Sequence, residues 1–157
     1  MKTKISIISS TKDEIQPLSL TQNDKAFEFF LFKSTALLEI NESLHEVNAG
    51  SILLRSPSIP LVINSQGNGA LVYSKVTFKG KDASKVATLS CIEPNIVLKP
   101  LQVHFADSII SKIQVEIKTK NFNWESIVFA QILELLAKTH RLTNHNFVET
   151  LPDHAQK

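Results

Sequence analysis

The chain has 157 residues, of which 43% are hydrophobic, and this length and composition support one core and exclude two independent domains. Its 17 basic and 15 acidic residues are spread along the chain and give a net charge of +2, which argues against a nucleic-acid surface on this chain itself. No apolar run approaches the roughly 20 residues that span a bilayer, so we expect a cytoplasmic protein without a membrane partner.

The first 23 residues are predicted to form an extended N-terminal arm. The arm begins with a β-rich stretch around Ile5 and Ile7 and continues through polar residues from Ser9 to Glu14. Pro17 then restricts the backbone. We expect the arm, residues 1–23, to add little to the core.

Residues 24–103 have the short, interrupted apolar segments of a β-structure. The segments Phe27 to Phe32 and Leu37 to Ile40 are rich in β-formers and too short for helices. Asn41 tolerates a positive φ, so the pattern predicts a hairpin over Glu39 to Glu46. Strands at this spacing without helices between them predict a sandwich or barrel.

Residues 104–142 are predicted to form a helical subdomain. Apolar residues recur at intervals of four, which favours an amphipathic helix over residues 108–119, and these are Phe105, Ile109, Ile113 and Ile117. A second helix is predicted from about Trp124 to His140. The polar tail, residues 143–157, contains Pro152 and is interpreted as a linker.

The second predicted helix carries two apolar stripes. One is suited to the domain core and consists of Val128, Phe129, Ile132, Leu133 and Leu136. The other is predicted to be a homodimer interface and consists of Trp124, Ile127, Gln131 and Leu135. An amide within an apolar seam is typical of coiled coils, where it sets the register. The alternative is that this stripe packs on the first helix or on the barrel.

Catalytic and metal-binding patterns are missing from the sequence. A metal site of the kind that cupin enzymes have needs several imidazoles, but His45 is the single histidine before Gly50. By comparison with cupin proteins that keep a later histidine, this sequence has Leu61 at that position. There is no phosphate-binding loop or nucleophile elbow. Cys91 lies in an apolar stretch interpreted as a strand, Val86 to Ile92, and is expected to be buried and inert. We therefore expect a non-enzymatic protein with no metal and no cofactor.

A frame of turns and strands runs through the β-rich half. Its parts are Asn41-Glu42-Ser43, Val47-Asn48-Ala49-Gly50, Ile52-Leu53-Leu54 leading to Pro57 and Pro60, and Phe78-Lys79-Gly80. With the helices that follow, residues 26–142 resemble the N-terminal, cupin-like effector-binding and dimerisation domain of AraC-type transcription regulators. The resemblance implies a mainly β fold with C-terminal helices, namely a cupin-like β-barrel followed by two α-helices. It also implies that DNA is bound by a C-terminal domain outside this chain.

The resemblance further implies a small effector inside the barrel, often a sugar or related metabolite, with the arm closing over it. By position, Tyr73, Lys75 and Ile63 correspond to inward ligand-binding residues, and Lys33 and Arg55 are weaker candidates. An inward Lys75 suggests an acidic or phosphorylated effector, because a buried ammonium needs an anion. The alternative is that Lys75 reaches solvent at the barrel rim.

The leading hypothesis is thus a non-enzymatic regulatory domain that binds a small effector and forms a homodimer. A small metal-free cupin enzyme acting on a sugar or related metabolite is one alternative, for which Tyr73 is the sole acid–base candidate. A pure interaction module is another, favoured if Leu61 and Ile63 fill the barrel.

Overall fold

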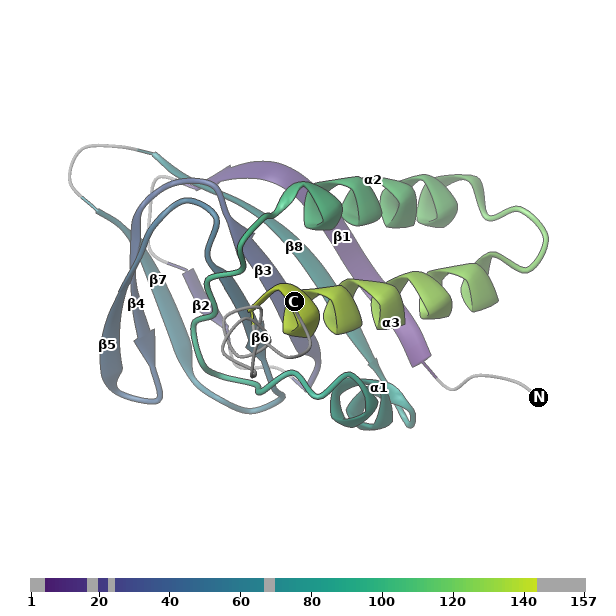
Figure 1. Ribbon diagram of the computed structural model, residues 1–157, viewed down its shortest axis with the longest axis horizontal. Coiled ribbons are helices and arrows are strands. Elements are labelled where there is room, and N and C mark those ends of the chain that lie inside the picture. The colour runs from purple at the N-terminus through teal and green to yellow at the C-terminus, as the bar shows by residue number, and fades with distance from the viewer. Residues whose placement is uncertain (1–4, 17–19, 23–24, 67–69, 144–157) are drawn as a thin grey trace, which may run out of the picture.

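The computed structural model describes residues 5–16, 20–22, 25–66 and 70–143, and for the first two ranges it describes the backbone alone. These residues form eight strands and three helices (Figure 1). The strands are β1 (Ile5–Gln16), β2 (Leu20–Gln22), β3 (Phe27–Phe32), β4 (Ala36–Ile40), β5 (Ser43–Val47), β6 (Ile52–Arg55), β7 (Leu61–Ser65) and β8 (Leu71–Gly80). The helices are α1 (Ala83–Leu89), α2 (His104–Thr119) and α3 (Trp124–Thr143).

The strands form two antiparallel sheets that face each other. The first sheet has the order β1-β8-β3-β6 and the second has the order β2-β7-β4-β5. In Figure 1 the second sheet lies at the left, and α2 and α3 run side by side along the other side of the first sheet. The first sheet is therefore covered on both faces.

Double coverage of the first sheet explains why all six residues of β3 are buried. Side chains alternate along a strand, so Phe30 and Phe32 enter the core between the sheets. Phe29 and Leu31 enter the core beneath the helices. We call the space between the two sheets the barrel interior.

The hairpin predicted at Asn41 is confirmed. β4 and β5 pair from Ala36↔Val47 to Ile40↔Ser43 and are joined by two residues with positive φ, Asn41 at 48° and Glu42 at 74°. Two such residues match the right-handed twist of the flanking strands, which is why this turn closes short hairpins.

The described parts of the predicted N-terminal arm pair into both sheets, with β1 in the first sheet and β2 in the second. β1 pairs along β8 from Ile5↔Gly80 to Gln16↔Leu71, and β2 pairs with β7. A ten-residue strand such as β8 presents a long row of backbone donors and acceptors, and β1 satisfies that edge. The remainder of the arm and the linker segment 144–157 lie outside the described residues.

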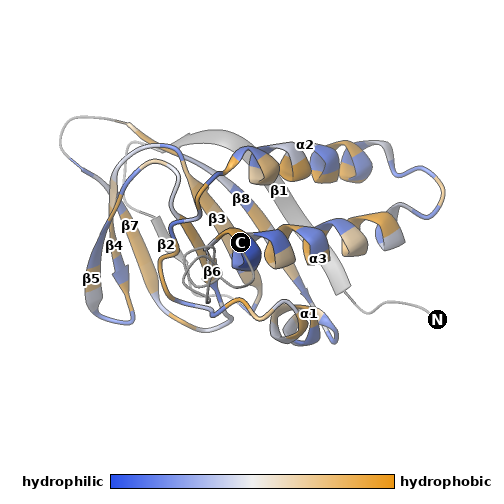
Figure 2. Ribbon diagram, in the orientation of Figure 1, coloured by the Kyte–Doolittle hydropathy of each residue, from blue (hydrophilic) through white to orange (hydrophobic). Residues whose placement is uncertain are grey.

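The two long helices agree with the sequence pattern, although α2 begins four residues before the predicted start. Figure 2 shows hydrophobic and hydrophilic residues alternating along both helices, as expected of helices with one buried face. Lys120 ends α2 in the left-handed region with φ 50°. No helix in the described ranges is long and apolar enough to cross a membrane.

Helix α1 was not predicted, and its presence corrects the expected environment of Cys91. The segment interpreted as a strand forms a seven-residue helix that buries Ala83, Val86 and Ala87. Such a short apolar pattern fits a strand and a helix equally well. Cys91 lies in the turn after α1 with φ 60° and is exposed.

Candidate functional site

The apolar part of the barrel interior is closely filled. Phe30 packs on Phe32 with ring centroids 5.7 Å apart, and Tyr73 meets Phe30 edge-on at 5.6 Å. Leu61 and Ile63 of β7 belong to the same buried cluster and are 0% exposed. Tyr73 and Ile63 therefore face inward as predicted, and they do so as packed core residues.

One end of the barrel interior is charged instead of apolar. Alternation along β3, β6 and β8 places Glu28, Arg55 and Lys75 on the inward face. The Arg55 Nε donates to Glu28 Oε1 at 2.8 Å, and Lys75 Nζ lies 3.4 Å from Glu28 Oε2. The side chains of Glu28 and Arg55 are 1% and 0% exposed, while that of Lys75 is 15% exposed. We call these three residues the charged cluster.

Arg55 fastens the charged cluster to the surrounding backbone. Its Nη1 donates to the carbonyl oxygens of Ser56 at 3.1 Å and Ile59 at 3.2 Å, and its Nη2 donates to Ala26 at 3.3 Å. A planar guanidinium is suited to several fixed acceptors at once. Arg55 therefore holds the loop after β6 and the residue before β3.

Thr77 adds an unsatisfied hydroxyl beside the charged cluster. It pairs with Glu28 across the β3–β8 register and shares the inward face with Lys75. The residue is 4% exposed, and its Oγ1 has no hydrogen-bond partner within the described part of the chain. Buried hydroxyls are normally hydrogen-bonded, so Thr77 has hydrogen-bonding capacity that the described residues leave unused.

The backbone of β1 is irregular at both positions that face these side chains. Its register with β8 shifts between Ile7 and Ser9, next to Thr77, and again between Thr11 and Glu14, next to Lys75. Bulges of this kind locally disrupt pairing and are frequent beside binding sites.

Two inward residues of this site, Glu28 and Thr77, were not predicted from the sequence. The signal for them was alternation, because Glu28 is two residues before inward Phe30 and Thr77 is two residues after inward Lys75. Lys33, by contrast, lies outside the barrel interior. Its Nζ binds Asp107 Oδ1 of α2 at 2.7 Å and so ties the end of β3 to the helices.

The predicted dimer residues are separated by the structure. Leu135 is 1% exposed within the core beneath the helices, and Trp124 packs against the same core, with Lys120 Nζ 5.5 Å from its ring centroid. Leu135 is thus removed from the predicted stripe, because α3 packs this side on α2 and the first sheet. Ile127 is 39% exposed and Gln131 is partly exposed.

A groove of about 340 Å³ lies between α2 and α3 on their outer side. It is lined by Ser111, Lys112, Val115, Glu116 and Gln131. The Oε1 atoms of Glu116 and Gln131 are buried there and lack a donor within the described residues. Val115 is 57% exposed beside them.

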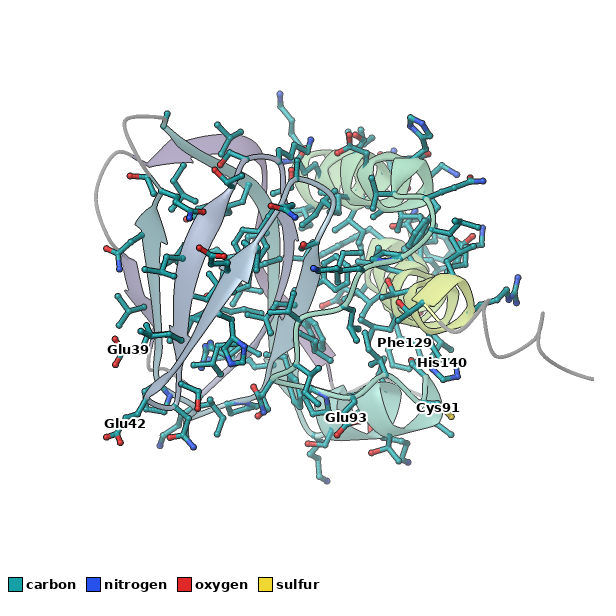
Figure 3. All side chains as sticks on the ribbon, turned by 60° about the vertical axis from the view of Figure 1, so that its left-hand side comes forward. Glu39, Glu42, Cys91, Glu93, Phe129 and His140 are labelled. Carbon is teal, nitrogen blue, oxygen red and sulfur yellow. The ribbon has the colours of Figure 1, made fainter. Side chains whose placement is uncertain are left out.

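A second hollow, of about 170 Å³, lies between the segment after α1 and the end of α3, far from the hairpin residues Glu39 and Glu42 (Figure 3). It is lined by Cys91, Ile92, Glu93, Leu98, His140 and Thr143. Despite the cysteine, histidine and glutamate there, no group of three metal-ligating side chains occurs in the described ranges.

No protein-family model matches the sequence, and no curated protein is significantly similar to it. ToxT from Vibrio cholerae, solved with (E)-4-(8-methylnaphthalen-1-yl)but-3-enoic acid bound, has a TM-score of 0.51 and 13% identity over 90% of this chain and 58% of its own. A cupin protein from Bacteroides fragilis has a TM-score of 0.36 and 17% identity over 50% of this chain and 68% of its own. A predicted oxalate decarboxylase from Thermotoga maritima has a TM-score of 0.36 and 16% identity over 40% of this chain and 59% of its own.

The likeness to ToxT shows the fold, since it extends over nearly the whole of this chain. The chain spans little more than half the length of the ToxT chain, 58%. Two facing antiparallel sheets followed by a pair of long helices confirm the fold predicted from the sequence. The chain is a cupin-like domain with C-terminal helices.

Proposed function

We propose that this chain is the regulatory part of a transcription regulator, in which the barrel binds a small effector and the helices join two copies. The observation that carries the proposal is the combination of barrel and helix pair, which ToxT, an AraC-family protein, shares over 90% of this chain. In this proposal the domain is not an enzyme, and DNA recognition belongs to a further domain of the regulator.

The ligand of ToxT is a carboxylic acid attached to an aromatic group. The barrel interior of this chain also combines a cationic side chain, Lys75, with aromatic ones, Phe30 and Tyr73. Because the apolar part is filled, we place the effector at the charged end, where Lys75 reaches solvent and Thr77 has an unused hydroxyl.

Dimerisation is assigned to the outer surface of α2 and α3. Val115 and Ile127 are 57% and 39% exposed there, and covering a large apolar side chain contributes about 1.5–3 kcal/mol. Lys112 and Glu116 both line the groove, so this surface carries a cation and a carboxylate that a second copy would meet. In a twofold interface each Lys112 would meet the partner copy's Glu116 reciprocally.

The test is a fusion of the full chain to a DNA-binding domain that represses a reporter only as a dimer. We expect repression by the unmodified chain and its loss in the double variant Val115→Glu with Ile127→Glu. The matched control is Leu44→Glu with Leu89→Glu, which adds the same charge at side chains that are 67% and 65% exposed elsewhere. Absence of repression by the unmodified chain, or equal loss in both double variants, would contradict dimerisation through this surface.

A pure interaction module with a filled barrel is the second candidate. The favouring observation is that Phe30, Phe32, Leu61, Ile63 and Tyr73 are all 0% exposed. This candidate predicts the same repression by the fusion but no stabilisation of the domain by any small molecule.

A further inference from the structure

At the charged end of the barrel, the carboxylate oxygens are occupied, whereas some hydrogen-bond donors are unused. This difference indicates what kind of effector the site can bind. Glu28 is the single carboxylate of the charged cluster, and both of its oxygens are occupied, Oε1 by Arg55 and Oε2 by Lys75. Arg55 directs its donors at Glu28 and at three backbone carbonyls. The opposite charges of Arg55 and Glu28 therefore compensate each other.

Lys75 has donors to spare. Within the described part of the chain its ammonium has one partner, Glu28 Oε2, at 3.4 Å. That distance is longer than the roughly 2.7–2.9 Å of a strong charge-assisted hydrogen bond. An ammonium carries three donors, so two remain for a ligand. With two cations and one carboxylate, the charged cluster has a formal charge of +1.

Thr77 contributes another donor on the same face. Its hydroxyl is buried without a partner in the described ranges, two positions along β8 from Lys75. A sugar hydroxyl that donates a hydrogen bond needs an acceptor, but both oxygens of Glu28 are already occupied. A ligand oxygen that accepts hydrogen bonds can use the donors of Lys75 and Thr77. The unused groups thus favour a ligand with negatively charged acceptor oxygens over a neutral polyol.

Lys75 is the residue through which this site reaches solvent. The Lys75 side chain is 15% exposed, whereas the side chains of Glu28 and Arg55 are buried. The two register shifts in β1 lie beside Thr77 and Lys75, so the strand that covers this edge is irregular at the site itself.

We propose that the effector carries a carboxylate or phosphate group, and that Lys75 and Thr77 bind this group at the charged end of the barrel. The inference rests on the proposed effector-binding function and narrows it to an anionic ligand. Glu28 and Arg55 position Lys75 and the adjoining loop without contacting the ligand.

Inorganic phosphate is the probe, because it presents the proposed group without any other part of an effector. Its effect on the thermal midpoint of the full chain is compared with sodium chloride at equal ionic strength and with glucose as a neutral polyol. We expect phosphate to raise the midpoint above the chloride value and glucose to leave it unchanged. Lys75→Met and Thr77→Val should each weaken phosphate binding by about tenfold or more, the range of single hydrogen bonds to charged groups.

Lys79→Met is the matched control, because Lys79 is an exposed lysine on the same strand and the substitution removes the same charge. It should bind phosphate as the unmodified chain does. Thr77→Val keeps the shape of the side chain, so the test stands even if Lys75→Met does not fold.

The inference is overturned if phosphate and chloride act alike on the unmodified chain. It is also overturned if the phosphate effect persists in both Lys75→Met and Thr77→Val, which would indicate an adventitious ion only. Stabilisation by glucose and not by phosphate would refute the anionic ligand while supporting effector binding. Phosphate binding with no repression by the fusion would instead support the anion site and refute the dimeric regulator.

Discussion

Replacing Arg55 by methionine tests whether the charged cluster is a buried, structural arrangement. The Arg55 side chain is 0% exposed and that of Glu28 is 1% exposed, so the two charges interact with little screening by water. Methionine has a similar length but neither the charge nor the donors. The substitution leaves the Glu28 carboxylate with Lys75 alone, at 3.4 Å.

The expected loss in the free energy of unfolding is about 3–5 kcal/mol, the usual cost of removing one partner of a buried ion pair. The carbonyl oxygens of Ala26, Ser56 and Ile59 also lose their guanidinium donors, which favours the upper part of that range. Lys75 offsets part of the cost by remaining near Glu28. For a domain of this size the loss corresponds to a thermal midpoint lowered by roughly 6–20 °C.

Urea unfolding followed by circular dichroism measures the loss, with Arg141→Met as the control. Arg141 is exposed near the end of α3, and its replacement should change stability by less than about 0.5 kcal/mol. Adding Glu28→Gln to Arg55→Met should recover part of the loss, because the buried carboxylate is then neutral. Equal effects of Arg55→Met and Arg141→Met, or no recovery in the double variant, would refute the interpretation of a sealed ion pair.

Four further outcomes are expected. Thr77→Val should raise the free energy of unfolding by about 1 kcal/mol in urea, because it removes a buried hydroxyl without a partner, and a destabilised variant would contradict this. Leu136→Ala should cost about 2–5 kcal/mol by the same assay, since the side chain is 0% exposed in the core beneath the helices. Light scattering at tens of micromolar should show a dimer for the unmodified chain and a folded monomer for Val115→Glu with Ile127→Glu, and a dimer unaffected by this change would refute the interface. Elemental analysis should find no stoichiometric transition metal, and about one bound iron, manganese or zinc per chain would overturn that expectation.

The order of strands followed by helices could largely be predicted, because it follows from local sequence patterns. The hairpin at Asn41 follows from residues that tolerate positive φ, and α2 follows from apolar residues repeating every four positions. The short helix α1 could not be predicted in the same way, because seven residues contain too few turns to distinguish a helix from a strand.

Within the candidate site, the sequence by itself determined that Tyr73 and Lys75 share the inward face of β8, because alternation along a strand is a local property. Only the tertiary structure decided which residues those two side chains contact. Glu28, the partner of Lys75, comes from another strand and is set by the register of β3 against β8.

Leu135 and Lys33 show the same division between local and tertiary information. The period of α3 placed Leu135 on a second stripe, but the packing of α3 on α2 and the first sheet buried it in the core. Lys33 was a weaker candidate for ligand binding, and the structure shows it bound to Asp107, 74 residues further along the chain. Periodicity determines which residues share a face of an element, whereas the surface opposite that face depends on contacts between segments far apart in the sequence.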